Sequence, residues 1–383
     1  MSNTPFSSCR YLRPRVSRSF REFFPGKSLL HFIAFTKMFV VITCYASLAQ
    51  DATTLPETDI YLLDIGTDKR GNLLFENPVR ITKNEGYDNE PWFYPDGSAI
   101  LYSAVRDTTS RSDTLRADIY KYNLNDQKIT AVIRTPRTSE FSPMIPPNKI
   151  GVSVVRVLED DTSQVLARCI DKQDDCDALF PKIRKVGYYI WVDPVRVAMV
   201  IVSDPAILVV ANLTTGKVDT IAEDVGQCLQ KLPGKNLQIA FVDKGSNPWT
   251  IKLFDGKSGK VSGVVPTLED QQDFCFMPDG SLLMGSGSKL YHYVPPVALA
   301  TTSRQASSHA TTPGKGAAAN SKNVPAQPGK PQEKKVKKND NDTGPWEEVA
   351  DFKGTAVYQF YRLAVSPKGN KLAVVTYLEE KPE

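Results

Sequence analysis

Short apolar stretches, separated by turn sequences, recur at regular spacing along most of the chain. The segment Trp92–Leu101 runs from an apolar strand through Tyr-Pro-Asp-Gly into a second apolar strand, and it recurs at Cys275–Met284 and Ala364–Ala373. Proline presets φ at such a turn, and glycine supplies a positive φ. Three weaker copies lie between these, so that the equivalent turn positions are 95, 146, 193, 233, 278 and 367. The pattern predicts six copies of one strand–turn–strand unit.

Each copy continues beyond its second strand. The expected second strands are 99–103, 150–155, 197–202, 237–242, 282–285 and 371–376. A third strand with alternating character follows, as at Asp118–Leu124, and then a shorter fourth strand, as at Lys128–Val132. Four short strands per repeat are typical of a β-propeller blade. The sequence therefore predicts an all-β fold, a six-bladed β-propeller with four antiparallel strands per blade; an ordinary β-sandwich would not require six equivalent turns.

The phase of the repeat predicts how the ring closes. The chain begins with 59–65 and 79–82, which have the character of third and fourth strands. It ends with 361–366 and 371–377, which have the character of first and second strands. One blade is therefore expected to be shared between the N- and C-terminal strands, which leaves no unmatched sheet edge in the ring.

The first 50 residues have the composition of an export signal. Positions 10–27 are basic and acid-poor, an apolar run occupies 29–48, and Ser47 and Ala49 place small residues before Gln50. This order predicts a signal peptide or leader over 1–50, cleaved near Ala49-Gln50. The mature protein is then expected to be periplasmic or secreted, without an integral membrane span.

Two features of this leader stay open. An uncleaved membrane anchor is the alternative to a cleaved signal, although Lys37 interrupts the apolar run and weakens a full bilayer span. The sequence also leaves open whether translation starts at Met1 or at Met38.

The interval between the last two turns, at 278 and 367, is longer than the others, and its composition explains why. Residues 295–345 are rich in Ala, Ser, Thr, Pro, Gly, Asn and Lys and have almost no aromatic residues. Such a segment cannot bury enough apolar surface to offset the entropy of ordering. We therefore expect a propeller over 51–383, interrupted by a disordered low-complexity insert at 295–345.

Composition limits the chemistry that the chain can perform. The net charge is +4, and acids and bases mix evenly within the repeats, so no basic face for nucleic acid is expected. Of the three histidines, only His292 lies outside the leader and the insert, and it alternates with tyrosines like a strand residue. No phosphate loop or metalloprotease motif is present. The sequence predicts no cofactor, no metal site and no catalytic residue.

Four cysteines follow the predicted cleavage site, an even number that is consistent with disulfides in an oxidising compartment. Six residues separate Cys169 from Cys176, which lets a hairpin place them together, and we expect a disulfide there. The sequence leaves open whether Cys228 and Cys275, in the first strands of consecutive blades, also pair.

A binding site in such a fold is expected on its axis. First strands line the central channel, so polar residues near their starts converge from all blades. The candidate binding residues are Glu90, Glu140, Tyr188, Gln227, Asp273 and Arg362. The alternative is that these side chains only solvate a water-filled channel.

The Pro-Asp-Gly blades with Asp-Ile-Tyr strands between them resemble the TolB-type β-propeller of bacterial envelope proteins. The resemblance covers about residues 59–377 apart from the insert, and its best matches are Tyr94–Gly97 and Met277–Gly280. It implies the propeller fold. TolB itself carries an α/β domain before its propeller, and we expect that domain to be missing here, because only a short segment separates the predicted cleavage site from the first strand.

These observations together favour a binding function. We expect an exported, envelope-associated propeller, monomeric and without catalysis, that recognises a protein or peptide partner. The alternative is a channel-site hydrolase or lyase that uses carboxylates and Arg362.

Overall fold

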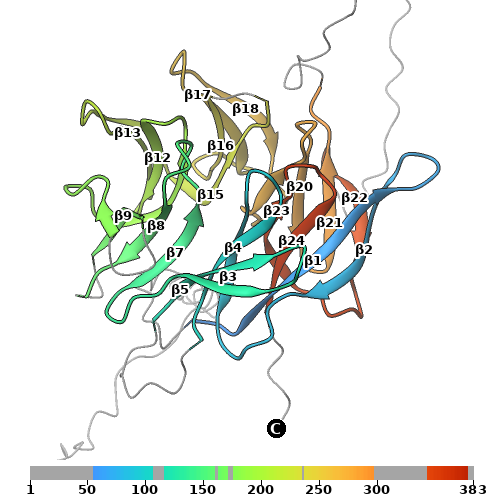
Figure 1. Cartoon of the computed structure of the whole chain (residues 1–383). Helices are drawn as coiled ribbons and strands as arrows, with labels where there is room; N and C mark the ends of the chain where they lie inside the picture. Colours follow the sequence, from blue (N-terminus) through green and yellow to red (C-terminus); the bar gives the residue numbers. More distant parts are fainter. Residues whose placement is uncertain are drawn as a thin grey trace, which may run out of the picture. The chain divides into compact units, whose positions relative to one another are not determined.

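The computed structural model describes residues 55–106, 116–159, 163–170, 176–234, 237–296 and 343–377, all within one compact unit that spans Ala49–Glu383. These residues form 24 strands in six four-stranded antiparallel sheets (Figure 1). The predicted leader at 1–50 and nearly all of the predicted insert lie outside the described residues and stay predictions. Within the described residues, no helix is long and apolar enough to cross a membrane.

The sheets follow one another along the chain as blades, each built from its inner strand outward. The first blade contains β3 (Asp88–Phe93), β4 (Ala99–Ala104), β5 (Asp118–Asn123) and β6 (Ile129–Ile133). The second contains β7 (Ser139–Met144), β8 (Val152–Val157), β9 (Gln164–Cys169) and β10 (Cys176–Ala178). The third contains β11 (Val186–Trp191), β12 (Arg196–Ile201), β13 (Ile207–Asn212) and β14 (Val218–Glu223).

The fourth blade contains β15 (Val225–Lys231), β16 (Gln238–Asp243), β17 (Thr250–Asp255) and β18 (Val261–Pro266). The fifth contains β19 (Phe274–Phe276), β20 (Leu282–Ser286), β21 (Lys289–Tyr293) and β22 (Glu347–Asp351). The shared blade contains β23 (Phe360–Val365), β24 (Lys371–Tyr377), β1 (Thr58–Thr67) and β2 (Leu73–Arg80). The prediction of six four-stranded antiparallel blades is confirmed.

The shared blade closes the ring as the phase of the repeat predicts. Strand β1 pairs with β24 in antiparallel register from Thr58 opposite Tyr377 to Asp64 opposite Lys371. Figure 1 shows the blue N-terminal strands beside the red C-terminal ones. The outermost strand, expected at 79–82, instead occupies Leu73–Arg80. Joining the two ends of the chain in one sheet ties the ring together by main-chain hydrogen bonds.

Six buried clusters of apolar side chains lie between neighbouring blades, and each draws on two of them. Ile60, Tyr102 and Val375, for example, are fully buried where the shared blade packs against the first. Complete burial of such a side chain contributes about 1.5–3 kcal/mol. Because the clusters follow one another around the whole ring, the core is an annulus and the axis is left for other side chains.

The turn after each inner strand has the geometry that its sequence requires. In the first blade, Gly97 has φ +73° and its N–H donates to the carbonyl of Tyr94 at 2.8 Å. Asp96 Oδ1 accepts the N–H of Ser98 at 2.9 Å, which fixes the turn further. The equivalent glycines Gly280 and Gly369 have φ values of +89° and +70°. These turns hold the far ends of the inner strands in equivalent positions.

Candidate functional site

The inner strands enclose a cavity of about 500 Å³ on the axis of the ring. Five of the six residues expected there line it: Glu90, Tyr188, Gln227, Asp273 and Arg362. They come from five different blades and lie near the starts of inner strands. We call these five residues, together with Ser142, the channel mouth.

Local breaks in strand pairing aim these side chains at the axis. The register between β3 and β4 shifts between Asn89 and Trp92, which leaves Glu90 at a bulge. The β23–β24 register shifts between Tyr361 and Leu363, on either side of Arg362. Glu90 has φ +59° and Arg362 has φ +49°, a left-handed conformation that is unfavourable for residues with a Cβ. Strained backbone of this kind persists where the surrounding structure imposes it, and it is concentrated at functional sites.

Arg362 is the centre of one half of the channel mouth. Its Nη1 donates to Asp273 Oδ1 at 3.1 Å, and its Cζ lies 4.9 Å from the centroid of the Tyr188 ring. Burial lowers the pKa of Arg362, but Asp273 and Tyr188 outweigh it and hold the guanidinium charged. Burial also raises the pKa of Tyr188, so this phenol stays protonated. The group is a fixed cation between a carboxylate and an aromatic face.

Glu90 forms the other half. Its Oε2 accepts the hydroxyl of Ser103 at 2.8 Å and the main-chain N–H of Ser142 at 2.5 Å. No described cation forms an ion pair with it. The carboxylate is therefore held from one side by two neutral donors, which orient it without neutralising its charge.

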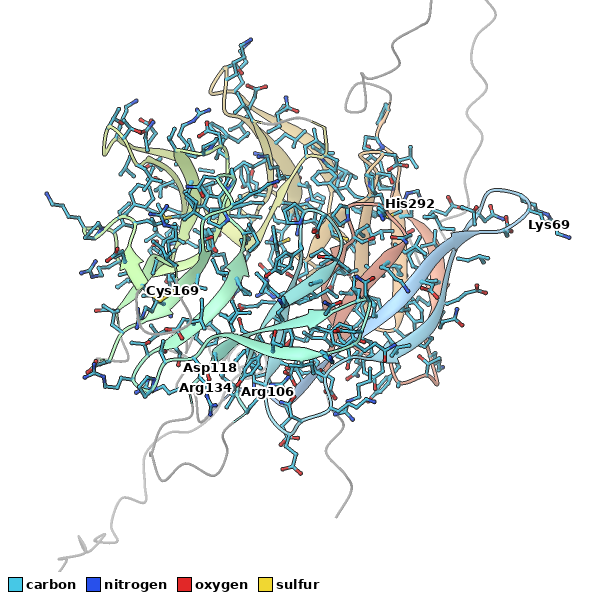
Figure 2. The ribbon with its side chains drawn as sticks, viewed as in Figure 1. Lys69, Arg106, Asp118, Arg134, Cys169 and His292 are labelled. Atoms are coloured by element: carbon cyan, nitrogen blue, oxygen red, sulfur yellow. A yellow bond between two sulfur atoms is a disulfide. The ribbon has the colours of Figure 1, made fainter. Side chains whose placement is uncertain are left out.

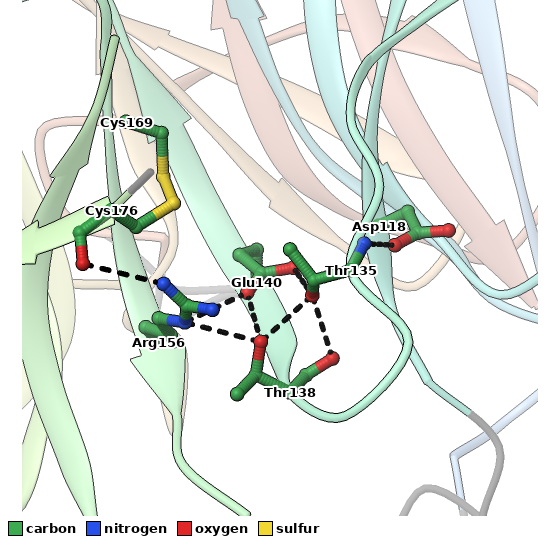
Figure 3. Close-up of a disulfide and its surroundings, with 7 residues drawn as sticks. All are labelled: Asp118, Thr135, Thr138, Glu140, Arg156, Cys169 and Cys176. Atoms are coloured by element: carbon green, nitrogen blue, oxygen red, sulfur yellow. Dashed lines mark hydrogen bonds and ion pairs between the residues drawn. A yellow bond between two sulfur atoms is a disulfide. The ribbon is translucent and has the colours of Figure 1, made fainter. Parts of the chain in front are cut away.

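Glu140 does not line the cavity, so the expectation that it lies on the axis with the other candidate residues is wrong. The side chain is fully buried, with Oε1 3.2 Å from Arg156 Nε and hydrogen bonds to the hydroxyls of Thr138 at 2.7 Å and Thr135 at 2.8 Å (Figure 3). Burial raises the pKa of Glu140 to about 7 against the lowering effect of these partners. Through Thr135, whose N–H donates to Asp118 Oδ1 at 3.0 Å, the network links the first blade to the second. Glu140 therefore holds two neighbouring blades together.

Ser142 occupies the position that Glu140 was expected to fill. It lines the cavity, has φ +52°, and lies in the break between Phe141 and Met144 in the β7–β8 register. The sequence contains a signal for this: Ser142-Pro143 repeats the polar-proline pair Glu90-Pro91. Proline lacks the N–H that a ladder requires, so both pairs mark a bulge. Aligning the two pairs identifies Ser142.

The far end of the cavity carries a different charge. Lys231, the last residue of β15, lines the cavity and donates from Nζ to the carbonyl of Val192 at 3.0 Å. The turn prolines Pro95, Pro233, Pro278 and Pro367 also line the cavity. The cavity therefore has two carboxylates and Arg362 near the starts of the inner strands, and Lys231 near their ends.

Two of the four described cysteines form a disulfide, and the other two are free thiols. Cys169 and Cys176 form a disulfide with their Cα atoms 4.0 Å apart. Cys228 and Cys275 are free and buried, which answers the question that the sequence left open. Burial raises the pKa of Cys228 to about 12 and also raises that of Cys275, so neither is a thiolate at neutral pH. Cys228 lines the cavity, but as a thiol it is a poor nucleophile.

His292 is the one histidine in the described residues, and it does not line the cavity. It lies on β21 of the fifth blade, across the ring from Cys169 of the second (Figure 2). Burial lowers its pKa and favours the neutral ring. A Ser-His-Asp arrangement in the cavity cannot use this residue.

The molecule is thus a closed six-bladed propeller with a polar and aromatic cavity on its axis. Its fold is similar to that of solved TolB propellers. A putative TolB from Agrobacterium tumefaciens superposes with a TM-score of 0.51 at 11% identity, over 85% of this chain and 99% of that one. No protein-family model and no curated protein matches the sequence.

Other solved propellers also match. TolB from Acinetobacter baumannii matches with a TM-score of 0.43 at 16% identity, over 63% of this chain and 61% of that one. An oligogalacturonate lyase from Vibrio parahaemolyticus matches with a TM-score of 0.45 at 10% identity, over 83% and 87% of the two chains. At such identities the likeness establishes the fold and nothing about the ligand.

Proposed function

We propose that this chain is an exported, envelope-associated binding propeller, monomeric and without catalysis, that recognises a protein or peptide partner through the channel mouth. The observation that carries the proposal is the fixed arrangement of Arg362, Asp273 and Tyr188 beside the oriented carboxylate of Glu90. Polar groups already held in place by the protein lose little freedom on binding, which favours affinity. An aromatic residue and an arginine at the centre of a concave site are also the residue types enriched at binding hot spots.

The predicted export signal supports the assignment to the cell envelope. The basic and apolar order of the first 50 residues predicts a signal peptide. The Cys169–Cys176 disulfide is of the kind that persists in an oxidising compartment.

A channel-site hydrolase or lyase is the second candidate. It is favoured by one observation, that two carboxylates, Glu90 and Asp273, line the same cavity as Arg362. Against it, Asp273 is engaged by Arg362, and neither the buried thiol of Cys228 nor His292 can serve as an activated nucleophile or base in the cavity. Binding is therefore the better supported function.

Site-specific photo-crosslinking in the native cells tests the proposal. A photoreactive amino acid is placed at Gln227 in the channel mouth and, as the matched control, at Val218, which is 46% exposed on the outer strand β14. We expect a discrete protein adduct from position 227 that is absent from position 218 and is lost when Tyr188→Ala is added. Equal adducts from both positions, or adducts from position 218 alone, would place the binding surface on the outer blades.

A further inference from the structure

Charges at the channel mouth do not balance. Asp273 and Arg362 neutralise each other at 3.1 Å. Lys231, the other cation lining the cavity, is held at the opposite end of its inner strand by the carbonyl of Val192. Among the described residues, no cation lies within ion-pair distance of Glu90, and Arg362 acts on it only from further away.

The two carboxylate oxygens of Glu90 differ in their hydrogen-bond partners. Oε2 accepts both the Ser103 hydroxyl and the Ser142 N–H, whereas Oε1 has no hydrogen-bond partner within the described part of the chain. The residue lines the cavity, so Oε1 can be reached by a ligand there. Its left-handed backbone, with φ +59°, keeps the side chain aimed at the axis.

Because only Oε1 of Glu90 is available to a ligand, the carboxylate favours some kinds of cation over others. A guanidinium pairs best with a carboxylate through two parallel hydrogen bonds, which requires both oxygens. An alkylammonium is a compact point charge and needs only one. A hard divalent cation prefers several oxygen ligands, and no group of three potential metal ligands occurs among the described residues.

We propose that Glu90 Oε1 receives an alkylammonium group of the bound partner, either a lysine side chain or a free amino terminus. The inference rests on the proposed function and specifies the chemistry of that site. Tyr188 lines the same cavity as Glu90, so its ring can contact the carbon chain that carries the ammonium.

Four short peptides, each with a fluorophore at its carboxyl end, test the assignment by fluorescence polarisation with the purified full chain. Acetyl-Gly-Lys-Gly is compared with acetyl-Gly-norleucine-Gly, and Gly-Gly-Gly with acetyl-Gly-Gly-Gly. The first pair reports a lysine side chain and the second a free amino terminus. We expect the charged member of at least one pair to bind about tenfold more tightly, which corresponds to about 1.4 kcal/mol.

Two variants and a salt series complete the experiment. Glu90→Gln keeps the shape of the side chain and should abolish the preference, whereas Glu76→Gln, on the exposed outer strand β2, should retain it. Raising the salt from about 0.01 M to about 1 M should reduce the preference, because the screening length falls from about 30 Å to about 3 Å. A parent protein without preference for either charged peptide, or a preference that survives Glu90→Gln, overturns the ammonium subsite.

The result is separable from that of the crosslinking experiment. If position 227 yields a partner adduct that Tyr188→Ala removes, but Glu90→Gln changes neither the adduct nor the peptide preference, the channel mouth binds and only the ammonium assignment fails. If no adduct depends on Tyr188, the proposed function itself fails.

Discussion

Two arginine–carboxylate pairs on the inner half of the ring have the same chemistry and different surroundings. In the pair of Glu140 with Arg156 the atoms are 3.2 Å apart, and the side chains are 0% and 10% exposed. In the pair of Asp273 with Arg362 the distance is 3.1 Å, and the side chains are 21% and 19% exposed. The first is sealed between two blades, and the second faces the axial cavity. Access to solvent therefore separates a structural clamp from a candidate binding site.

The largest expected difference between the pairs is in stability. Replacing Arg156 by Met leaves the buried carboxylate of Glu140 without its cation, and loss of one partner of a buried pair costs about 3 kcal/mol or more. At about pH 8, where Glu140 is ionised, we expect a fall in melting temperature of roughly 5–10 °C. Arg362→Met, the matched change in the open pair, should cost less, because Asp273 keeps access to solvent in the cavity. Equal losses in differential scanning calorimetry would contradict the distinction.

The sealed pair should also give the protein a pH dependence that has a definite sign. The pKa of Glu140 is raised to about 7 from 4.5, so the folded state holds this proton more tightly than the unfolded chain does. Its contribution to the free energy of unfolding is present below about pH 4.5 and is lost as the pH rises through about 7.

Glutamine at this position cannot ionise. Between about pH 5 and about pH 8, the free energy of unfolding of the parent should therefore fall by up to about 3 kcal/mol more than that of Glu140→Gln. Urea unfolding at several pH values measures the difference. Glu76→Gln is the exposed control and should follow the parent. Parallel curves for the parent and Glu140→Gln would show that the buried carboxylate does not titrate in this range.

The disulfide lies beside the sealed pair and should support it. Arg156 Nη1 donates to the carbonyl of Cys176 at 3.4 Å (Figure 3). Replacing Cys169 and Cys176 together by Ser frees a short loop in the unfolded chain and should cost about 2 kcal/mol. Peptide binding at the channel mouth should remain within about twofold of the parent. A tenfold loss of binding would mean that the two regions are coupled.

An effect similar in size to that of the disulfide is expected at the strained position whose N–H donates to Glu90. Ser142 has φ +52°, which a β-branched residue adopts at high cost and glycine at almost none. We expect Ser142→Val to lower the free energy of unfolding by about 2 kcal/mol, and Ser142→Gly to leave it within about 1 kcal/mol. The order of the two variants in thermal unfolding is the test. If Val is tolerated as well as Gly, the bulge is not maintained in solution.

The blades and their closure could be predicted because each depends on local patterns. Pro-Asp-Gly turns fix where inner strands end, and apolar alternation fixes the strands that follow, so six repeats determine six blades. Five channel-mouth residues could be predicted for the same reason, since a closed ring brings the starts of inner strands together. The extent of β2 was less predictable, because Glu76, Asn77 and Pro78 interrupt the apolar pattern inside the strand.

The error at Glu140 has a specific physical origin. Side-chain direction along a strand alternates with period two only while the ladder is regular, and a bulge interrupts it. Counting back from the turn at Pro146 ignores the break between Phe141 and Met144, which directs Ser142 to the axis. Nor could the sequence show that Arg156 is available to Glu140, because their pairing depends on the register of β7 with β8.

The central claim is that the channel mouth binds the partner while the sealed pair only holds the blades together. The most direct test measures partner crosslinking and melting temperature for Tyr188→Ala and Arg156→Met side by side. Tyr188→Ala should abolish the adduct from position 227 and lower the melting temperature less than Arg156→Met does, because Tyr188 is only partly buried where it packs between the third and fourth blades. Arg156→Met should lower the melting temperature by roughly 5–10 °C and keep the adduct at temperatures where the protein is folded. Retention of the adduct in Tyr188→Ala, or its loss in folded Arg156→Met, would contradict the account.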